Sequence, residues 1–193
     1  SLPSRGLGDV YKRQMKKIYL LTILLSFGLQ AQEINWMSFP EALEAQKKEP
    51  KKIFMDVYAN WCGPCKLLEK RTFSNEDLIA YVNENFYAVK FNGEGIEEIY
   101  FYDRVFNNPK YDPKRKGKNS SHQFTQFLGI SAYPTMVFFD ENGGPIMPVV
   151  GYYKPQKLEP YLKMIGKEDY TSFSSPQDMR KYISEFISNF SDL

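Results

Sequence analysis

Short apolar runs alternate along the chain with segments whose apolar residues recur at helical spacing. The clearest run, residues 53–58, is too short for a typical helix and too continuously apolar for a half-exposed strand. It therefore predicts a central strand that is buried on both faces. Residues 34–39 and 86–91 predict a strand before this run and another after it. Residues 135–140 predict a further strand, which Asn142-Gly143-Gly144 turns into a hairpin.

Helix signals fall between these runs. Ser38-Phe39-Pro40-Glu41 is a capping box with proline in the first turn, and it predicts a helix that ends near residues 48–50. A second cap at residues 74–77 begins a helix whose apolar residues face inward. We expect three further helices, over residues 62–71, 123–128 and 155–165.

Residues 92–121 show no clear period and are rich in Tyr, Phe, Asn, Pro and Gly. Residues 96–106 are compatible with a helix, whereas residues 107–121 predict a surface loop. The basic run within this loop, residues 110–118, is most often a solvated feature of such loops. The alternative is a docking site for an acidic partner.

The region after Gly166 predicts a polar linker and one more helix, over roughly residues 176–190. Five of its apolar side chains recur at helical spacing: Met179, Tyr182, Ile183, Phe186 and Ile187. Base rates favour a helix docked on the core over a helix that binds a partner.

A leader precedes the expected domain. Met15-Lys16-Lys17 and the apolar residues 18–29, followed by Ala31, are typical of a secretory signal peptide, so residues 15–31 are expected to be removed. An uncleaved anchor is disfavoured because the apolar core is shorter than the roughly 20 residues that span a bilayer. Residues 1–14 resemble read-through of an adapter upstream of Met15, a non-native leader that we exclude from the fold.

Composition favours one domain, because 193 residues that are 42% hydrophobic and 16% aromatic make one core and would be cramped as two. The formal charge is +2, but five basic residues and one acidic residue lie within residues 1–31. Beyond residue 31 there are 20 basic and 22 acidic residues, a net charge of −2. This balance gives no argument for binding nucleic acid.

The only two cysteines lie two residues apart in a single motif, Trp61-Cys62-Gly63-Pro64-Cys65-Lys66. If the motif opens a helix, the i, i+3 spacing brings both sulfurs to its first turn, where one disulfide can form and break with little backbone movement. The helix N-terminus favours negative charge, so Cys62 is expected to be rich in thiolate, with a pKa of roughly 3.5 to 7.5 as in related motifs.

Zinc binding is the competing interpretation of this cysteine spacing. A structural zinc site needs about four ligands, and the chain has no second cysteine pair and only one histidine, His122. We expect no metal, and we expect His122 to be an exposed loop residue and not a catalytic base.

The order of these features resembles thioredoxin: a β-α-β entry, the Trp-Cys-Gly-Pro-Cys-Lys helix start, Tyr133-Pro134-Thr135 before a strand, a glycine-turn hairpin and a final helix. The break at residues 71–74 is more similar to the secreted thiol-disulfide interchange branch. The resemblance implies an α/β thioredoxin fold, a central mixed sheet flanked by helices, over residues 32–166. Residues 92–121 are then an insertion between the third strand and third helix of the family, and residues 167–193 add an extra C-terminal helix.

The resemblance also implies the roles of individual residues. Cys62 is expected to be the exposed nucleophile that attacks a substrate disulfide, and Cys65 the thiol that releases the mixed disulfide. Five residues are implied to contact the substrate: Trp61, Gly63, Pro64, Tyr133 and Pro134. Trp61 is expected to shield the disulfide, and the alternative is a tryptophan of the core.

Asp56 interrupts the apolar run 53–58. Burying one ionised carboxylate costs several kcal/mol, so its pKa should be raised and it could take a proton from Cys65. The alternative is an acid at the edge of a strand. Lys90 matches the lysine that pairs with this acid in the family, although its own sequence context predicts a solvent-facing side chain.

Pro134 matches a cis-proline of the family, although the sequence alone favours a trans bond. The backbone of Tyr133 is then expected to pair with an extended substrate segment, as in strand addition. A large aromatic residue at 133 departs from the smaller aliphatic residue usual in thioredoxin, which changes the expected range of substrates.

The function implied is reduction of protein disulfides in the periplasm or outside the cell. Gly63-Pro64 resembles the reducing end of a range of potentials about 150 mV wide. The expected partners are disulfide-containing clients and an upstream electron donor, which is either bound to a membrane or secreted, with no cofactor and no nucleic acid. A disulfide oxidase or isomerase is the alternative direction, and a partner-binding module with a static disulfide is the alternative class.

Overall fold

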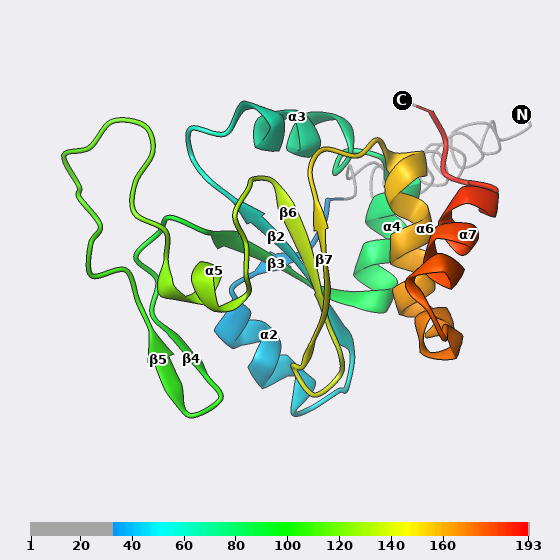
Figure 1. Ribbon diagram of the computed structural model, residues 1–193, viewed down its shortest axis with the longest axis horizontal. Coiled ribbons are helices and arrows are strands. Elements are labelled where there is room, and N and C mark those ends of the chain that lie inside the picture. The colour runs from blue at the N-terminus through cyan, green and yellow to red at the C-terminus, as the bar shows by residue number, and fades with distance from the viewer. Residues whose placement is uncertain (1–32, 193) are drawn as a thin grey trace, which may run out of the picture. The chain divides into compact units, whose positions relative to one another are not determined.

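A five-stranded mixed sheet, in the order β1-β3-β2-β6-β7, forms the centre of the protein in the computed structural model, which describes residues 33–192 (Figure 1). The strands are β1 (Trp36–Met37), β2 (Lys52–Tyr58), β3 (Phe86–Asn92), β6 (Thr135–Phe139) and β7 (Pro145–Val150). The first three run parallel to one another, and β6 and β7 are antiparallel to their neighbours. The expected mixed sheet is confirmed. The expected leader segments, 1–14 and 15–31, lie outside the described residues.

Strand β2 occupies the middle of the sheet, as its apolar run predicts. It pairs with β3 on one side and β6 on the other, and every residue from Lys52 to Val57 is buried. Because successive side chains of a strand point to opposite faces, Phe54 enters one hydrophobic cluster while Ile53 and Met55 enter another.

Helices cover both faces of the sheet. On the face of Phe54 the core is completed by α3 (Gly63–Arg71), α4 (Glu76–Asn85) and α6 (Pro155–Gly166). On the face of Ile53 it is completed by α2 (Phe39–Gln46) and α5 (Gln123–Phe127). The predicted capping box at Ser38 is present, with Glu41 as its second member, and α2 ends slightly before the predicted residues 48–50.

The insertion contains a β-hairpin where the sequence is compatible with a helix over residues 96–106. Strands β4 (Ile99–Phe101) and β5 (Arg104–Phe106) form a separate two-stranded sheet. The hairpin is favoured over a helix because alternate apolar side chains of the two strands, such as Ile99 and Phe106, pack into the core beside α5. Residues 107–121 form a loop, as predicted.

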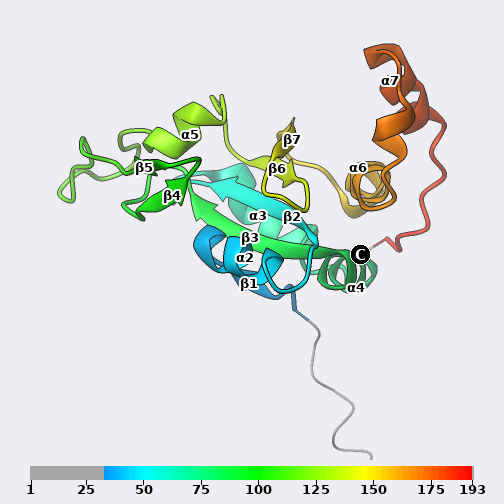
Figure 2. The same ribbon diagram turned by 90° about the horizontal axis from the view of Figure 1, so that it is seen from below.

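The C-terminal helix α7 (Pro176–Glu185) is five residues shorter than the predicted 176–190, and a 3₁₀ helix, η1 (Asp169–Ser172), precedes it. No side chain of α7 is fully buried, although Met179 and Tyr182 pack against the core. In Figures 1 and 2, α6 and α7 lie at the end of the sheet opposite the β4–β5 hairpin. The docked helix is therefore a loosely held element at one end of the domain.

An extended segment after α7, residues 187–192, makes the tighter contacts with the core. Glu159 of α6 is completely buried, and its Oε2 accepts hydrogen bonds from the Ser188 hydroxyl and from the backbone N–H groups of Asn189 (2.8 Å) and Phe190 (2.9 Å). Its Oε1 lies 2.9 Å from Lys163 Nζ. Burial opposes ionisation, but these hydrogen bonds outweigh it, so the pKa of Glu159 lies below its ordinary value. We call residues 187–192 the C-terminal strap.

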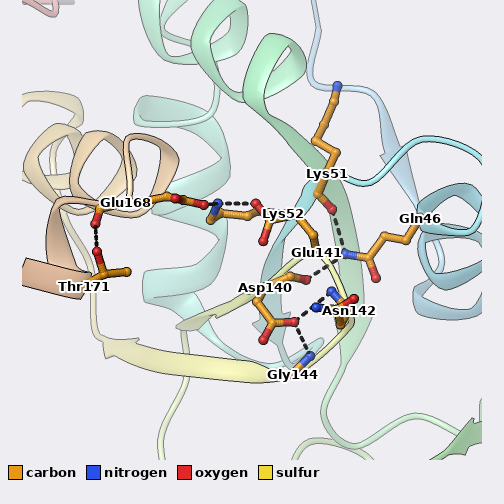
Figure 3. A network of polar contacts seen from close by, with 9 residues as sticks. All are labelled: Gln46, Lys51, Lys52, Asp140, Glu141, Asn142, Gly144, Glu168 and Thr171. Atoms are coloured by element: carbon orange, nitrogen blue, oxygen red, sulfur yellow. Dashed lines mark hydrogen bonds and ion pairs between the residues drawn. The ribbon is translucent and has the colours of Figure 1, made fainter.

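A polar network joins distant parts of the chain at the start of β2 (Figure 3). Buried Lys52 pairs with Glu141 of the β6–β7 turn and with Glu168, whose carboxylate lies 2.8 Å from Lys52 Nζ. Gln46 donates to the carbonyls of Lys51 (2.7 Å) and Asp140 (2.8 Å). This network fixes the end of the sheet that lies away from the cysteine motif. No helix in residues 33–192 has the length and apolar character needed to cross a bilayer.

Candidate active site

Cys62 and Cys65 are joined by a disulfide at the start of α3, with an S–S distance of 2.03 Å. Cys62 is the N-cap residue, and its Sγ accepts a hydrogen bond from the backbone N–H of Cys65 at 3.1 Å. Once the disulfide is reduced, the same N–H and the positive end of the helix favour negative charge on Cys62. The helix start thus stabilises the thiolate form of the first cysteine.

Both cysteines are buried in the disulfide form, which corrects the expectation of an exposed Cys62. Cys62 is 1% exposed and Cys65 is 7% exposed. Ala59 packs with the pair, and the side chains of Tyr58 and Tyr133 lie against the same cluster. The sequence of the motif does not predict that the cysteines are buried, because Tyr133, which packs against them, comes from a distant part of the chain.

Asp56 is buried in β2 beside the motif, at 2% exposure, and is not the strand-edge acid of the alternative. Its Oδ2 lies 3.4 Å from Lys90 Nζ, on the neighbouring strand, and its Oδ1 accepts no hydrogen bond from any group in the described part of the chain. Burial raises the pKa of Asp56 to about 6, Lys90 opposes the rise and Glu69 adds to it. The carboxyl group can therefore exchange a proton near neutral pH.

Lys90 faces a box of aromatic rings and two carboxylates instead of open solvent. Its Nζ lies 5.1 to 5.6 Å from the ring centroids of Trp36, Tyr58 and Phe73. Glu69 Oε1 lies 3.2 Å from the same atom. Sequence reasoning missed Glu69, although its position four residues after Cys65 on α3 places the two on one helix face.

A small cavity of about 180 Å³ connects the acid with the second cysteine. Its lining includes Asp56, Cys65, Glu69 and Lys90. A space of this size has room for water between Cys65 and Asp56, and such water would carry a proton from one to the other.

The peptide bond between Tyr133 and Pro134 is cis, as the resemblance implies. The Tyr133 ring lies over Gly93, where an added Cβ would be 2.5 Å from Tyr133 Cε1, so this glycine makes room for the ring. Burial raises the pKa of Tyr133 to about 12, nearby Glu94 adds to the rise, and Ser121 and Thr125 oppose it. The Tyr133 side chain is thus uncharged and packs beside the disulfide.

Trp61 lies at the surface, 38% exposed, and is not a core tryptophan. Its ring meets the Tyr133 ring edge to face, with centroids 6.1 Å apart. Its Nε1 donates to Glu94 Oε2 at 2.8 Å. Sequence reasoning did not select Glu94, because this contact links residues 33 positions apart.

His122 is completely buried, which corrects the expectation of an exposed loop residue. It is the N-cap of α5: Nδ1 accepts from the backbone N–H of Phe124 at 3.0 Å, and Nε2 donates to the carbonyl of Glu97 at 2.7 Å. Its ring also packs edge to face on Phe91. Burial lowers the pKa of His122, against the Glu97 carbonyl, so a neutral imidazole serves as a structural cap.

The described residues, 33–192, contain no group of three His, Cys, Asp or Glu side chains that could hold a metal ion.

Comparison with known proteins agrees with this geometry. The sequence model of a family described as a thioredoxin-like domain matches residues 39–166. The chain belongs to the thioredoxin-like family. Within the matched region, Cys62 and Cys65 have C-x-x-C spacing and are joined by a disulfide.

Curated relatives include thiol-disulfide proteins. Thiol:disulfide interchange protein DsbD of Photorhabdus laumondii is 24% identical over 135 residues, which are 69% of this chain and 19% of the relative. Thioredoxin-like protein 1 of Schizosaccharomyces pombe is 29% identical over 116 residues, which are 60% of this chain and 30% of the relative. The matched part is thus less than a third of each relative.

Solved structures share the fold. A thioredoxin-fold protein from Helicobacter pylori superposes with a TM-score of 0.55 at 22% identity, covering 81% of this chain and 92% of its own. A candidate disulphide-isomerase from Bacteroides thetaiotaomicron has a TM-score of 0.51 at 30% identity, covering 72% of this chain and 98% of its own. The family, with its thioredoxin fold, is therefore supported by both sequence and structure.

Proposed function

We propose that this protein reduces protein disulfides outside the cytoplasm by cycling Cys62 and Cys65 between dithiol and disulfide. The observation that carries the proposal is the cysteine pair at a helix start, beside a buried carboxyl group whose pKa lies near neutral. A static structural disulfide would need neither feature, because it neither ionises nor exchanges protons.

In the first step, the Cys62 thiolate attacks one sulfur of a client disulfide. A mixed disulfide forms between Cys62 and the client, and the other client sulfur leaves as a thiolate. The backbone N–H of Cys65, which points at Cys62 Sγ, stabilises the thiolate before the attack.

In the second step, the Cys65 thiol gives its proton to the ionised Asp56 through the cavity between them, and the resulting thiolate attacks Cys62 Sγ. The bond between Cys62 and the client breaks, and the second client sulfur leaves as a thiolate. Two electrons pass from the dithiol to the client, and the Cys62–Cys65 disulfide that remains is the state described above.

The client segment lies against the rim of the motif. Trp61, Gly63 and Pro64 are exposed there, and Gly63 has open space on its Cα. The backbone at Tyr133 and Pro134 offers edge pairing to an extended client segment. Regeneration of the dithiol needs an upstream electron donor, and the signal-like residues 15–31 support a periplasmic or secreted location.

Trapping the mixed disulfide tests this function. In Cys65→Ser, the second step is blocked, so Cys62 should accumulate covalent adducts with disulfide-containing clients that dithiothreitol releases. Non-reducing gels with mass spectrometry of the adducts provide the measurement. The double variant Cys62→Ser, Cys65→Ser is the control and should trap nothing. Equal, empty lanes for both variants would instead indicate a binding module with a static disulfide.

The direction of electron flow needs a second measurement. We expect equilibration with glutathione to give a potential nearer the reducing end, about −270 mV, than the oxidising end, about −120 mV. The 30% identity to the candidate disulphide-isomerase favours isomerisation as the second candidate function. A potential near about −180 mV, together with rescue of a scrambled-disulfide substrate, would favour that candidate.

A further inference from the structure

The insertion contains a strongly basic loop, residues 107–121, and one end of this loop reaches Trp61 beside the disulfide. Five exposed side chains of this loop are basic: Lys110, Lys114, Arg115, Lys116 and Lys118. Asp112 is its only acidic residue. We call residues 107–121 the basic loop.

Hydrogen bonds fix the two ends of the basic loop to the domain. The buried side-chain amide of Asn108 donates to the carbonyls of Gly95 (3.0 Å) and Ser120 (2.8 Å), and its oxygen accepts from the Ser120 hydroxyl at 2.7 Å. Asn119 and Asp112 exchange two further hydrogen bonds across the loop. These hydrogen bonds restrict the motion of the loop backbone, so its positive charges stay in one region.

The same loop contacts the active site directly. Glu94 Oε2 accepts from Trp61 Nε1 at 2.8 Å and from the backbone N–H of Asn119 at 2.7 Å, so one carboxylate joins the tryptophan to the loop. Lys118 Nζ lies 4.6 Å from the centroid of the Trp61 ring. Trp61 is the residue next to Cys62, so a client segment that reaches Cys62 passes beside the loop.

The rest of the domain has the opposite charge. Outside the basic loop, acidic residues outnumber basic ones in residues 33–192. An acidic client is therefore repelled by the domain as a whole and attracted at the rim of the disulfide. Since the Debye length at physiological salt is about 8 Å, the local charges dominate once the client is in contact.

We infer that the basic loop selects disulfides whose cysteines are flanked by carboxylate side chains. This inference rests on the proposed reduction of client disulfides and names the class of client that the same site prefers. The attraction acts on encounter and orientation of the client segment, and the chemistry at Cys62 is unchanged. An anionic membrane surface is the other candidate for a basic patch, but the contact of Lys118 with Trp61, next to Cys62, favours the client.

Competition among three peptides tests the inference. Each peptide carries the same disulfide between two cysteines, flanked by Glu, by Ser or by Lys residues, and the rate of its reduction by the reduced protein is measured. We expect the Glu peptide to react about fivefold faster than the Ser peptide at low salt, and the ratio to fall toward one in about 1 M salt, where the Debye length is about 3 Å.

A matched pair of variants locates the effect. Arg115→Glu with Lys116→Glu reverses an exposed Arg-Lys pair in the basic loop, and Arg180→Glu with Lys181→Glu reverses an exposed Arg-Lys pair on α7. The loop variant should lose the preference for the Glu peptide while reducing the Ser peptide at the wild-type rate. The α7 variant should keep the preference. Equal unfolding midpoints for the two variants establish that both are folded.

Three results would overturn the inference. The first is equal rates for the Glu and Ser peptides in the wild type, and the second is an unchanged preference in the loop variant. The third is binding of wild type, but not the loop variant, to phosphatidylglycerol vesicles without any peptide preference, which would assign the patch to a membrane. Failure of the proposed function differs from all three, because then no peptide is reduced, the Ser peptide included.

Discussion

At the scale of single residues, Asp56 is an ionisable side chain that is buried in the core. It lies in the central strand, its Oδ1 accepts no hydrogen bond from the described residues, and its Oδ2 lies 3.4 Å from Lys90 Nζ. Ionising a carboxyl group in such a place costs free energy of folding. The residue is therefore buried at the expense of stability, which agrees with the proposed role of Asp56 as the group that accepts a proton from Cys65.

The cost should be measurable as a dependence of stability on pH. The pKa of Asp56 is raised from 3.8 to about 6, so the folded state holds its proton over a range in which the unfolded chain has lost it. Stability is therefore highest below pH 3.8 with respect to this group and falls as the pH rises to about 6, by about 3 kcal/mol in all. Asp56→Asn should remove this fall and raise the unfolding free energy near neutral pH by a similar amount.

Urea unfolding of the oxidised protein over a pH series checks this prediction. Glu69→Gln is the control, because Glu69 is largely exposed and contacts the same lysine, so its loss should change stability little. If Asp56→Asn keeps the pH dependence of the wild type, another group is responsible for it.

The site residues differ in how far the sequence predicts them. Cys62, Cys65 and the burial of Asp56 follow from local signals, namely an isolated cysteine pair and an acid within an apolar run. Glu94 and His122 act through contacts that link residues 33 and 25 positions apart. Such contacts depend on where the insertion folds back, and no local pattern predicts that.

Among the elements, the β4–β5 hairpin departs most from the sequence prediction. Its turn residues, Tyr102 and Asp103, have φ values of 49° and 56°, the left-handed region that a two-residue hairpin turn requires at both positions. The usual signal for such a turn is Asn-Gly, and Tyr-Asp gives no such signal. Tyr102 stays in place because its ring stacks on Phe101, with centroids 4.1 Å apart.

Asp103→Gly should therefore stabilise the protein, because glycine adopts the left-handed conformation without steric cost. We expect a gain of about 0.5 to 1 kcal/mol in unfolding free energy, measured by denaturant titration. Tyr102→Gly is the matched control: the same conformational gain is offset by the loss of the ring that stacks on Phe101. No gain in Asp103→Gly would show that the turn carries no strain at this position.

Several of the remaining elements agree with the sequence because their signals are local, whereas the strand predicted over residues 34–39 is confined to Trp36–Met37, since α2 begins at Phe39. Caps, proline positions and apolar periods gave the starts of α2 and α4 and the central position of β2. The predicted end of α7, at residue 190, is wrong because the backbone of Phe186 is already extended, with a ψ of 124°. From Phe186 the chain turns to run along α6. The helical period of apolar residues continues to residue 187, but the hydrogen bonds from residues 188–190 to Glu159 favour an extended chain after the helix.

For the domain as a whole, the C-terminal strap should stabilise more than α7 does. A chain that ends after Glu185 loses all three hydrogen bonds to Glu159 and leaves that buried carboxylate with Lys163 alone. We expect this truncation to lower the unfolding free energy by about 3 kcal/mol or more, measured by urea unfolding at neutral pH. The loss of stability should be smaller in acid. The lowered pKa of Glu159 stabilises the folded state only above the ordinary pKa of glutamate, and this contribution to the unfolding free energy disappears as the pH falls.

A chain that ends after Ser191 is the control, since it keeps residues 188–190 and should match the full protein. If both chains unfold at the same urea concentration, the strap contributes nothing. The sequence predicts the presence of a C-terminal element but not this anchoring, because its partners lie 29 to 31 residues away and include backbone N–H groups that no side-chain pattern reveals.

The strap also has a consequence for the order of folding. Every strand of both sheets and both cysteines precede Glu159, and three of the groups that bind Glu159 come only at residues 188–190. Until those residues are in place, the Glu159 carboxylate has Lys163 as a partner but lacks these hydrogen bonds, so its burial is less favourable. We therefore expect α6 and the strap to join the folded domain in one coupled step.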